Sequence, residues 1–250
     1  MTTRIQGNHK NPQARIPPLR ITTLGYMAIV AIFLLGLDAM SRDGLQGERT
    51  GTISGKITPP PDDLLESLRR GKKMLRYDDV AHASEPIEPY RLAEVAVVYV
   101  EDVPDGEHYT LPAVNPGLNQ SQMVFRPLVL PVVVGTTVDF PNNDNLFHNV
   151  FSYSQAKEFD LGRYPRGRKR SVTFDKPGIV NVYCDIHSYM FATILVLTNP
   201  YFSLPGEDGS FSIPGVPQGT YDLTFWYGRK KVSTRKVKVD GDKTSSVNFP

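Results

Sequence analysis

The stretch YCDIHSYM, residues 183–190, contains the single cysteine in a chain of 250 residues. Cys184 is followed by His187 three positions later and by Met190 after three more. A thiolate, an imidazole and a thioether within seven residues form a set of soft ligands. Such a set favours copper over the harder cations, which prefer oxygen ligands.

The run just before these ligands has the pattern of a strand. Residues 179–184 alternate so that Val180, Val182 and Cys184 share one face. This pattern predicts a strand that turns the thiol toward an apolar interior. Residues 191–197 are apolar except for Thr193 and are predicted to form the strand that closes the site.

A fourth donor is needed and lies upstream. Residues 139–150 read DFPNNDNLFHNV and supply His148, which is followed by Asn149. One Cys, two His and a weak axial Met form the arrangement of blue-copper electron-transfer sites. Zinc is the next metal to consider, but structural zinc sites use several Cys or His and no Met.

These motifs resemble the cupredoxins, the family of plastocyanin and amicyanin. The shared features are a His-Asn pair at a strand end and a short Cys-x2-His-x2-Met loop, similar to that of amicyanin, within roughly residues 121–198. The resemblance implies a Greek-key β-sandwich that binds one copper ion, as Cu(I) or Cu(II). It implies the ligands His148, Cys184 and His187, with Met190 as a long axial ligand.

Three neighbouring residues are assigned supporting roles. By the same resemblance, Asn149 ties the two ligand-bearing loops together through a hydrogen bond. A plain turn asparagine is the alternative. Phe147 and Tyr183, together with Tyr189, are expected to form an apolar collar that excludes water, or else to serve as ordinary core residues.

A second pattern lies near the C-terminus. Residues 208–221 read DGSFSIPGVPQGTY, followed by a strand in which every second residue up to 227 is large and apolar. This pattern resembles the second half of carboxypeptidase-regulatory-like, transthyretin-type β-sandwiches. Residues 51–57 and 95–100 are similar to strands of the first half of that module.

The two resemblances together predict an all-β chain with an inserted domain. We expect residues 51–103 and 201–250 to form one split transthyretin-like sandwich. The cupredoxin domain, residues 111–199, is expected to lie between them in the chain. Trp226 is expected to pack inside the split sandwich.

Other segments are read from local pattern. Residues 124–140 suggest strands that are broken at Pro131, and 152–170 suggest a surface loop or a weak edge strand. Leucines at helical spacing in 62–75 predict a short amphipathic helix.

Length and composition suit one large or two small domains of the all-β class. The chain has 20 Gly and 21 Pro for turns and is 40% hydrophobic, which is enough for cores. One cysteine excludes an internal disulfide framework. Residues 157–170 carry six Lys or Arg against two acids, which suits either an acidic redox partner or a solvated loop. No nucleic-acid recognition motif accompanies these charges.

The N-terminus has the pattern of a targeting segment. Residues 1–20 are basic and contain no acid, and 21–37 contain no charge. We predict a cytoplasmic tail, 1–20, and a transmembrane anchor or signal, 21–38. The bulk of the chain would then be periplasmic and held at a bacterial inner membrane by 21–37, or secreted if residues 1–41 are cleaved.

The predicted function is therefore single-electron transfer outside the cytoplasmic membrane, without enzymatic activity. The predicted partner is a redox protein, such as a cytochrome or a dehydrogenase. Two alternatives stay open, which are a copper store or sensor and a non-redox cell-surface binding module. A catalytic thiol at Cys184 is disfavoured, because it leaves Met190 without a role.

Overall fold

The computed structural model describes three parts of the chain, which are residues 49–60, 88–104 and 109–250. The predicted tail and membrane segment, 1–38, and the predicted helix, 62–75, lie outside these residues. Among the residues that are described, no helix is long and apolar enough to cross a membrane.

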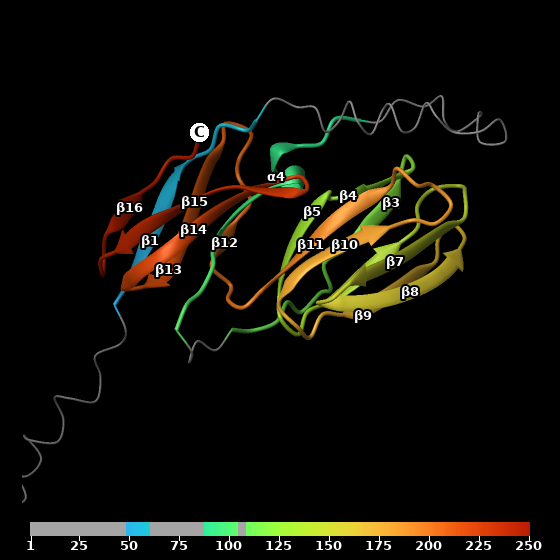
Figure 1. Cartoon of the computed structure of the whole chain (residues 1–250), viewed down its shortest axis with the longest axis horizontal. Helices are drawn as coiled ribbons and strands as arrows, with labels where there is room; N and C mark the ends of the chain where they lie inside the picture. The colour runs from blue at the N-terminus through green and yellow to red at the C-terminus, as the bar shows by residue number, and fades with distance from the viewer. Residues whose placement is uncertain (1–48, 61–87, 105–108) are drawn as a thin grey trace, which may run out of the picture. The chain divides into compact units, whose positions relative to one another are not determined.

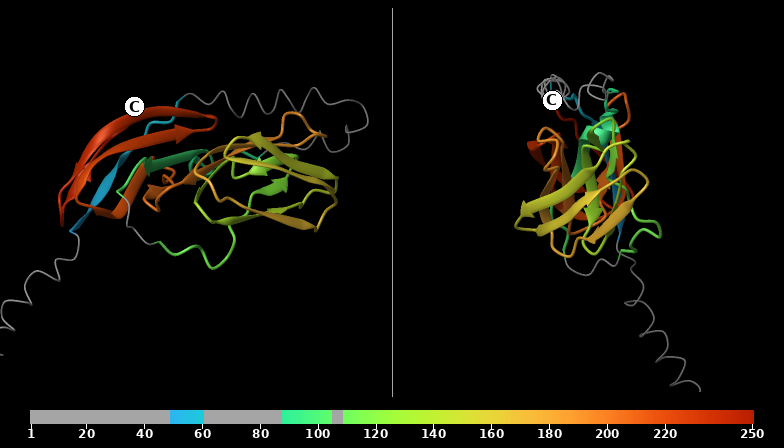
Figure 2. Two further views of the ribbon diagram at one scale, coloured as in Figure 1. Left: turned by 60° about the horizontal axis from the view of Figure 1, so that its bottom comes forward. Right: turned by 90° about the vertical axis from the view of Figure 1, so that its right-hand side faces the viewer.

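Strands β3 to β11 form a sandwich that we call the central sandwich (Figures 1 and 2). Its larger sheet has five strands in the order β5 (Val129–Val133), β11 (Phe191–Leu197), β10 (Gly178–Tyr183), β7 (His148–Ser154) and β8 (Lys157–Tyr164). The other strands form two antiparallel pairs, β3 (Asn119–Ser121) with β4 (Val124–Arg126), and β6 (Thr137–Pro141) with β9 (Lys169–Thr173).

The core of the central sandwich forms as the alternation predicts. Val180, Val182 and Cys184 are buried in one apolar cluster, whereas Ile179 is 47% exposed. Because successive side chains of a strand point to opposite faces, Cys184, two positions after Val182, shares the inward face of the buried valines. The predicted orientation of Cys184 is therefore confirmed.

Two predictions about strands need correction or refinement. Strand β5 continues through Pro131 instead of breaking there, and it is the edge strand beside β11. An edge strand tolerates proline because one side of it makes no ladder hydrogen bonds. The charged segment 152–170 contains β8, the opposite edge strand, so the edge reading holds for that part, whereas its two ends belong to β7 and β9.

The remaining strands form a second sandwich, which we call the outer sandwich (Figure 1). One sheet has the order β13 (Ser210–Pro217), β1 (Thr50–Lys56), β16 (Thr244–Ser246). The other has the order β12 (Phe202–Ser203), β2 (Ala96–Val100), β14 (Gly219–Tyr227), β15 (Lys230–Val239). A short helix, α4 (Leu92–Val95), precedes β2.

The first of these sheets joins segments that are distant in sequence. Strand β1 pairs antiparallel with β13 and parallel with β16. The central sandwich thus lies, in the chain, between the two halves of the outer one. The likeness of the outer sandwich to transthyretin-type modules, and the exact domain boundaries, stay predictions.

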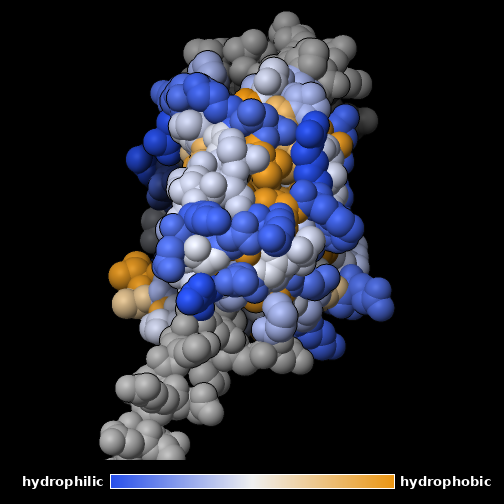
Figure 3. Space-filling model, turned by 90° about the vertical axis from the view of Figure 1, so that its left-hand side faces the viewer, coloured by the Kyte–Doolittle hydropathy of each residue, from blue (hydrophilic) through white to orange (hydrophobic). Residues whose placement is uncertain are grey.

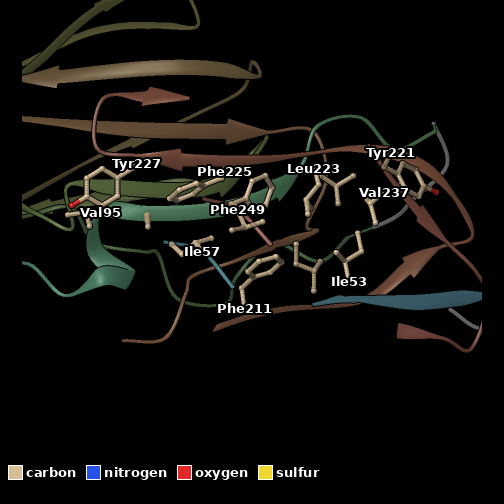
Figure 4. Close-up of a cluster of buried hydrophobic side chains, with 14 of the residues drawn as sticks. Ile53, Ile57, Val95, Phe211, Tyr221, Leu223, Phe225, Tyr227, Val237 and Phe249 are labelled. Carbon is tan, nitrogen blue, oxygen red and sulfur yellow. The ribbon is translucent and has the colours of Figure 1, made fainter. Parts of the chain in front are cut away.

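The core of the outer sandwich is apolar and rich in aromatic rings. Ile53, Phe211, Leu223 and Phe225 are buried together, and the rings of Phe225 and Phe249 lie 5.7 Å apart (Figure 4). Seen from the end that this sandwich forms, hydrophobic residues make a central strip between hydrophilic ones (Figure 3).

A smaller apolar cluster joins the two sandwiches, which belong to one compact unit, Glu48–Pro250. Trp226 and Val97 of the outer sandwich pack with Val129 and Leu195 of the central one. Trp226 therefore lies between the two sandwiches, and the expectation that it packs inside the outer one is wrong. Because β11 is packed on both faces, all seven of its residues are buried, and all but Thr193 are apolar.

Candidate metal centre

Three of the four expected copper ligands lie at strand ends. His148 is the first residue of β7, Cys184 directly follows β10, and Met190 directly precedes β11. His187 lies in the loop between β10 and β11. Because β7 and β10 are neighbours in the sheet, their ends bring His148 next to the β10–β11 loop.

Three of the four side chains converge on one point. The Sγ atom of Cys184 lies 3.9 Å from Nδ1 of His148 and 3.8 Å from Nδ1 of His187. The two Nδ1 atoms are 3.0 Å apart. All three residues are buried, and among the described residues they form the group able to hold a metal.

Met190 lies in the same apolar cluster as Cys184 and is fully buried. Its backbone N–H donates a hydrogen bond of 2.9 Å to the carbonyl oxygen of His187, which closes the loop tightly. The axial role of its thioether stays a prediction.

The thiol of Cys184 is poised to ionise. Burial alone would raise its pKa, yet hydrogen bonds from His148 and His187 and from two backbone N–H groups lower the pKa from 9.0 to about 6. One of these N–H groups belongs to Asn149. A thiolate is the form that binds metal, so the site is prepared for a cation.

Sequence reasoning missed a carboxylate behind His148. The Nε2 atom of His148 lies 2.8 Å from Oδ2 of Asp144. A hydrogen bond from Nε2–H to this carboxylate leaves Nδ1, the atom that faces Cys184, free for a metal. The available signal was an acidic residue four positions before the histidine, but in a loop this spacing does not fix a contact.

In the Asp144–His148 pair, each group shifts the pKa of the other toward its charged form. Burial alone would lower the pKa of His148, but the Asp144 carboxylate and the Cys184 thiolate raise it. Burial would raise the pKa of Asp144, but the hydrogen bond from His148 and the backbone N–H groups of Met123 and Gln122 lower it. In the metal-free protein His148 therefore tends to hold a proton that a metal must displace.

Asn142 holds the loop that precedes His148. Its buried amide Nδ2 donates to the carbonyl oxygens of Leu146, at 2.8 Å, and Tyr164, at 3.0 Å. Its Oδ1 accepts a 3.0 Å hydrogen bond from the backbone N–H of Asp144. The fold thereby fixes both the carboxylate and the strand end that carries the ligand.

Asn149 is near the site but acts differently from the expectation. Its side-chain Nδ2 donates to Oδ1 of Asp160 on β8, at 2.6 Å, rather than to the loop of Cys184. Its backbone N–H is the group that contacts Cys184. The link between the two ligand-bearing segments is thus made by the main chain.

The three aromatic residues of the predicted collar lie in different surroundings in the structure. Tyr189 packs against the core of the central sandwich, with its ring 6.4 Å from that of His187. Phe147 is 57% exposed, and Tyr183 packs against the core of the outer sandwich. Alternation explains Tyr183, because its neighbour Cys184 points to the opposite face.

The donors present suit copper. Two imidazoles and a thiolate, with a thioether close in sequence, match the softer and borderline transition metals rather than calcium or magnesium. The ligand atoms are buried, and a carboxylate behind one histidine orients it.

A family model agrees with this donor set. Residues 112–197 match the model described as copper binding proteins, plastocyanin/azurin family. This segment, about a third of the chain, is therefore a domain of the cupredoxin type. The expected cofactor, one copper ion, is confirmed by the match together with the His148, Cys184 and His187 set. A search of curated proteins found no match to the chain.

Solved structures of copper proteins are similar to part of the chain. A variant of amicyanin with Cu(I) is 21% identical, with a TM-score of 0.31, over 33% of this chain and 81% of its own. A purple cupredoxin from Nitrosopumilus maritimus is 23% identical, with a TM-score of 0.30, over 33% and 99%. A copper-containing nitrite reductase from Thermus scotoductus is 28% identical, with a TM-score of 0.33, over 44% and 27%.

Proposed function

We propose that this protein carries single electrons through one copper ion held by His148, Cys184 and His187, with Met190 as the axial ligand. The observation that carries the proposal is the convergence of the thiol and the two Nδ1 atoms within 3.9 Å in a buried site. Copper bound there supplies a one-electron couple between Cu(II) and Cu(I).

The residues around the site restrict its movement. Asp144 and Asn142 fix the His148 side through hydrogen bonds, and the paired strands β10 and β11 fix both ends of the other loop. A donor set that is held in place changes little between two oxidation states. Small reorganisation is the property that an electron carrier needs, whereas a store or a sensor has no such need.

The enzyme alternative is disfavoured by the burial of the thiol. The Cys184 residue is 3% exposed and lies among apolar side chains. A nucleophile must reach its substrate, and this sulfur faces two imidazoles and a core. We therefore propose a carrier without enzymatic activity.

The turn between β8 and β9 is the surface that we propose for a redox partner. Arg166 and Arg168 are exposed there, and Gly167 donates a 2.8 Å hydrogen bond to the carbonyl of Asn142. The basic turn is thus attached to the loop that precedes His148. Its charge fits an acidic redox protein, for which it speeds encounter.

We further propose that residues 21–38 anchor the protein, or direct its export, so that the copper domain works outside the cytoplasmic membrane of a bacterium. The uncharged run after a basic tail supports this location. Separating membranes from soluble fractions, with an antibody against the outer sandwich, distinguishes an anchored from a cleaved form.

The decisive experiment is a visible and electron-spin-resonance spectrum of residues 42–250 with Cu(II) added at one equivalent. A blue-copper carrier shows an intense thiolate-to-Cu(II) band. Reversible bleaching by a one-electron reductant and recovery on oxidation support the electron-carrier role. Tight copper binding without reversible reduction would favour a store, and absence of binding would favour a non-redox surface module.

The partner surface is tested by the rate of reduction from an acidic electron donor. Replacing Arg166 and Arg168 by Gln is expected to slow the reaction and to weaken its dependence on salt, because exposed charges act at long range. Replacing Lys236 and Lys238, two exposed residues of the outer sandwich, by Gln gives the matched control. Equal slowing by both variants would exclude docking at the basic turn.

A further inference from the structure

One side chain of the outer sandwich, that of Arg229, contacts the residue that directly follows the copper-ligand loop. Arg229 lies in the turn between β14 and β15, next to Gly228, which has a φ of +58°. The N–H of Gly228 donates a 2.8 Å hydrogen bond to the carbonyl of Val95 and thereby fixes the turn. The guanidinium carbon of Arg229 lies 3.2 Å from the centre of the Phe191 ring.

Phe191 stands at the base of the ligand loop. It directly follows Met190 and pairs across the strands with Tyr183, which directly precedes Cys184. The pair Tyr183–Phe191 therefore joins the two ends of the loop 184–190. Alternation turns the two ligands into the central core and these two rings outward.

The outward rings belong to the outer sandwich by packing. Phe191 is 5% exposed and is part of the apolar cluster of that sandwich, and Tyr183 packs against the same cluster. Arg229 covers the Phe191 ring with a planar cation. A guanidinium stacks on an aromatic face through its plane and its charge, which fixes the ring in a way that a flexible neutral side chain does not.

We propose that Arg229 is a positioning residue of the copper centre, through which the outer sandwich holds the Tyr183–Phe191 pair and thus both ends of the ligand loop. The copper part of this inference rests on the proposed function; the restraint of the loop does not. The outer sandwich is then a structural component of the metal centre and not only an attachment to it.

The test compares Arg229→Gln with Lys230→Gln. The second change removes an equal charge from the neighbouring residue, which is the first of β15. Both residues are exposed, so neither change opens a cavity. Amide hydrogen exchange is measured on copper-free residues 42–250. In Arg229→Gln the exchange of amides 185–190 is expected to rise about two- to fivefold, the factor that a cation–π contact at an exposed site corresponds to. In Lys230→Gln it is expected to stay unchanged.

The location of the effect decides between positioning and general destabilisation. Acceleration confined to the ligand loop and to the first residues of β11 supports the proposal. Acceleration spread evenly over both sandwiches, or equal in the two variants, overturns it. Because this measurement uses no metal, it stands even if the wild-type protein fails to bind copper, an outcome that would defeat only the proposed function.

Copper-loaded protein gives a second readout that a purely structural contact would not move. Arg229→Gln is expected to lower the reduction potential below that of Lys230→Gln, because a positive charge beside the loop favours Cu(I). The release of Cu(I) to a chelator is expected to quicken by about the same two- to fivefold factor. Identical potentials and release rates in the two variants would overturn the role of Arg229 at the metal centre.

Discussion

The two sandwiches differ in what they bury. Of the ten buried polar residues that are described, eight lie in the central sandwich, and they are Gln120, Thr136, Asn142, His148, Asn149, Ser152, His187 and Thr193. The core of the outer sandwich is an apolar cluster whose buried aromatic rings include those of Phe211, Tyr221, Phe225 and Phe249. The contrast separates a domain built to hold a site from one built to be stable.

The polar groups of the central sandwich have a cost. A buried imidazole or amide must be hydrogen-bonded to offset its lost hydration, and an apolar group of equal size would stabilise the core more. Copper binding to the folded state recovers part of this loss by mass action. The outer sandwich, packed against β5 and β11, supports the same sheet from the other side.

The largest effect is expected from Cys184→Ser. This change removes the sulfur ligand and should abolish the intense visible band entirely, while circular dichroism keeps its β-sheet signal. The corresponding change in the outer sandwich, Ser233→Ala, should leave the band intact. A Cys184→Ser protein that stays blue would show that the thiol is not a ligand.

The second largest effect is expected in the core of the outer sandwich. Phe225→Ala in the outer core should reduce the free energy of unfolding by about 3–5 kcal/mol, because it leaves a cavity among rings. Denaturant titration measures it. Since Phe225 is not among the residues of the metal cluster, the copper spectrum of the folded protein should not change. A lost band in folded protein would mean that the two cores are coupled more tightly than their contacts indicate.

A smaller effect is expected from Asp144→Asn, which keeps the shape of the side chain but removes its charge. Copper affinity should fall about 10- to 100-fold, the usual consequence of changing the group that orients a histidine ligand. Competition with a chelator measures it. The control is Asp175→Asn, because Asp175 is exposed and pairs with Lys157 rather than with a group of the site. Equal copper affinities in wild type and Asp144→Asn would show that Asp144 does not support the metal centre.

The smallest effect is expected from acid titration of Asp139, a residue of β6 that faces Ser171 of β9. Hydrogen bonds from Lys169 and Ser171 lower its pKa from 3.8 to about 2. A lowered pKa stabilises the fold above pH 3.8, and this contribution is lost as the pH falls toward 2. Asp139→Asn should make stability less sensitive to pH in that window, by under about 1 kcal/mol, because the Lys169 partner is solvent-screened. An unchanged slope in denaturation curves between pH 4 and 2 would contradict this.

Much of the site follows from sequence because its signals are local. The alternation of residues 179–184 sets the direction of Cys184, and the spacing to His187 and Met190 is short enough for one loop. His148 follows from the need for a fourth donor. The pairing of β1 with β13 and β16 joins segments that the sequence resemblance placed in one split module.

Other features depend on tertiary contacts that carry no local signal. Pro131 is compatible with a strand only because β5 is an edge, which depends on strand order. Trp226 looks like any core residue until the sheet is known to be covered on both faces. The contact of Asp144 with His148 depends on a loop that Asn142 holds, so its spacing alone did not reveal it.

The position of β1 between β13 and β16 has a consequence for biosynthesis. Strand β1 leaves the ribosome early, but both strands that flank it are made only after residue 209. The copper-binding segment is complete by then, so it is free to fold while β1 still waits for neighbours. Translation order therefore favours folding of the central sandwich first and closure of the sheet around β1 last, and a ribosome that stalls near residue 205 would leave β1 with no partner on either side.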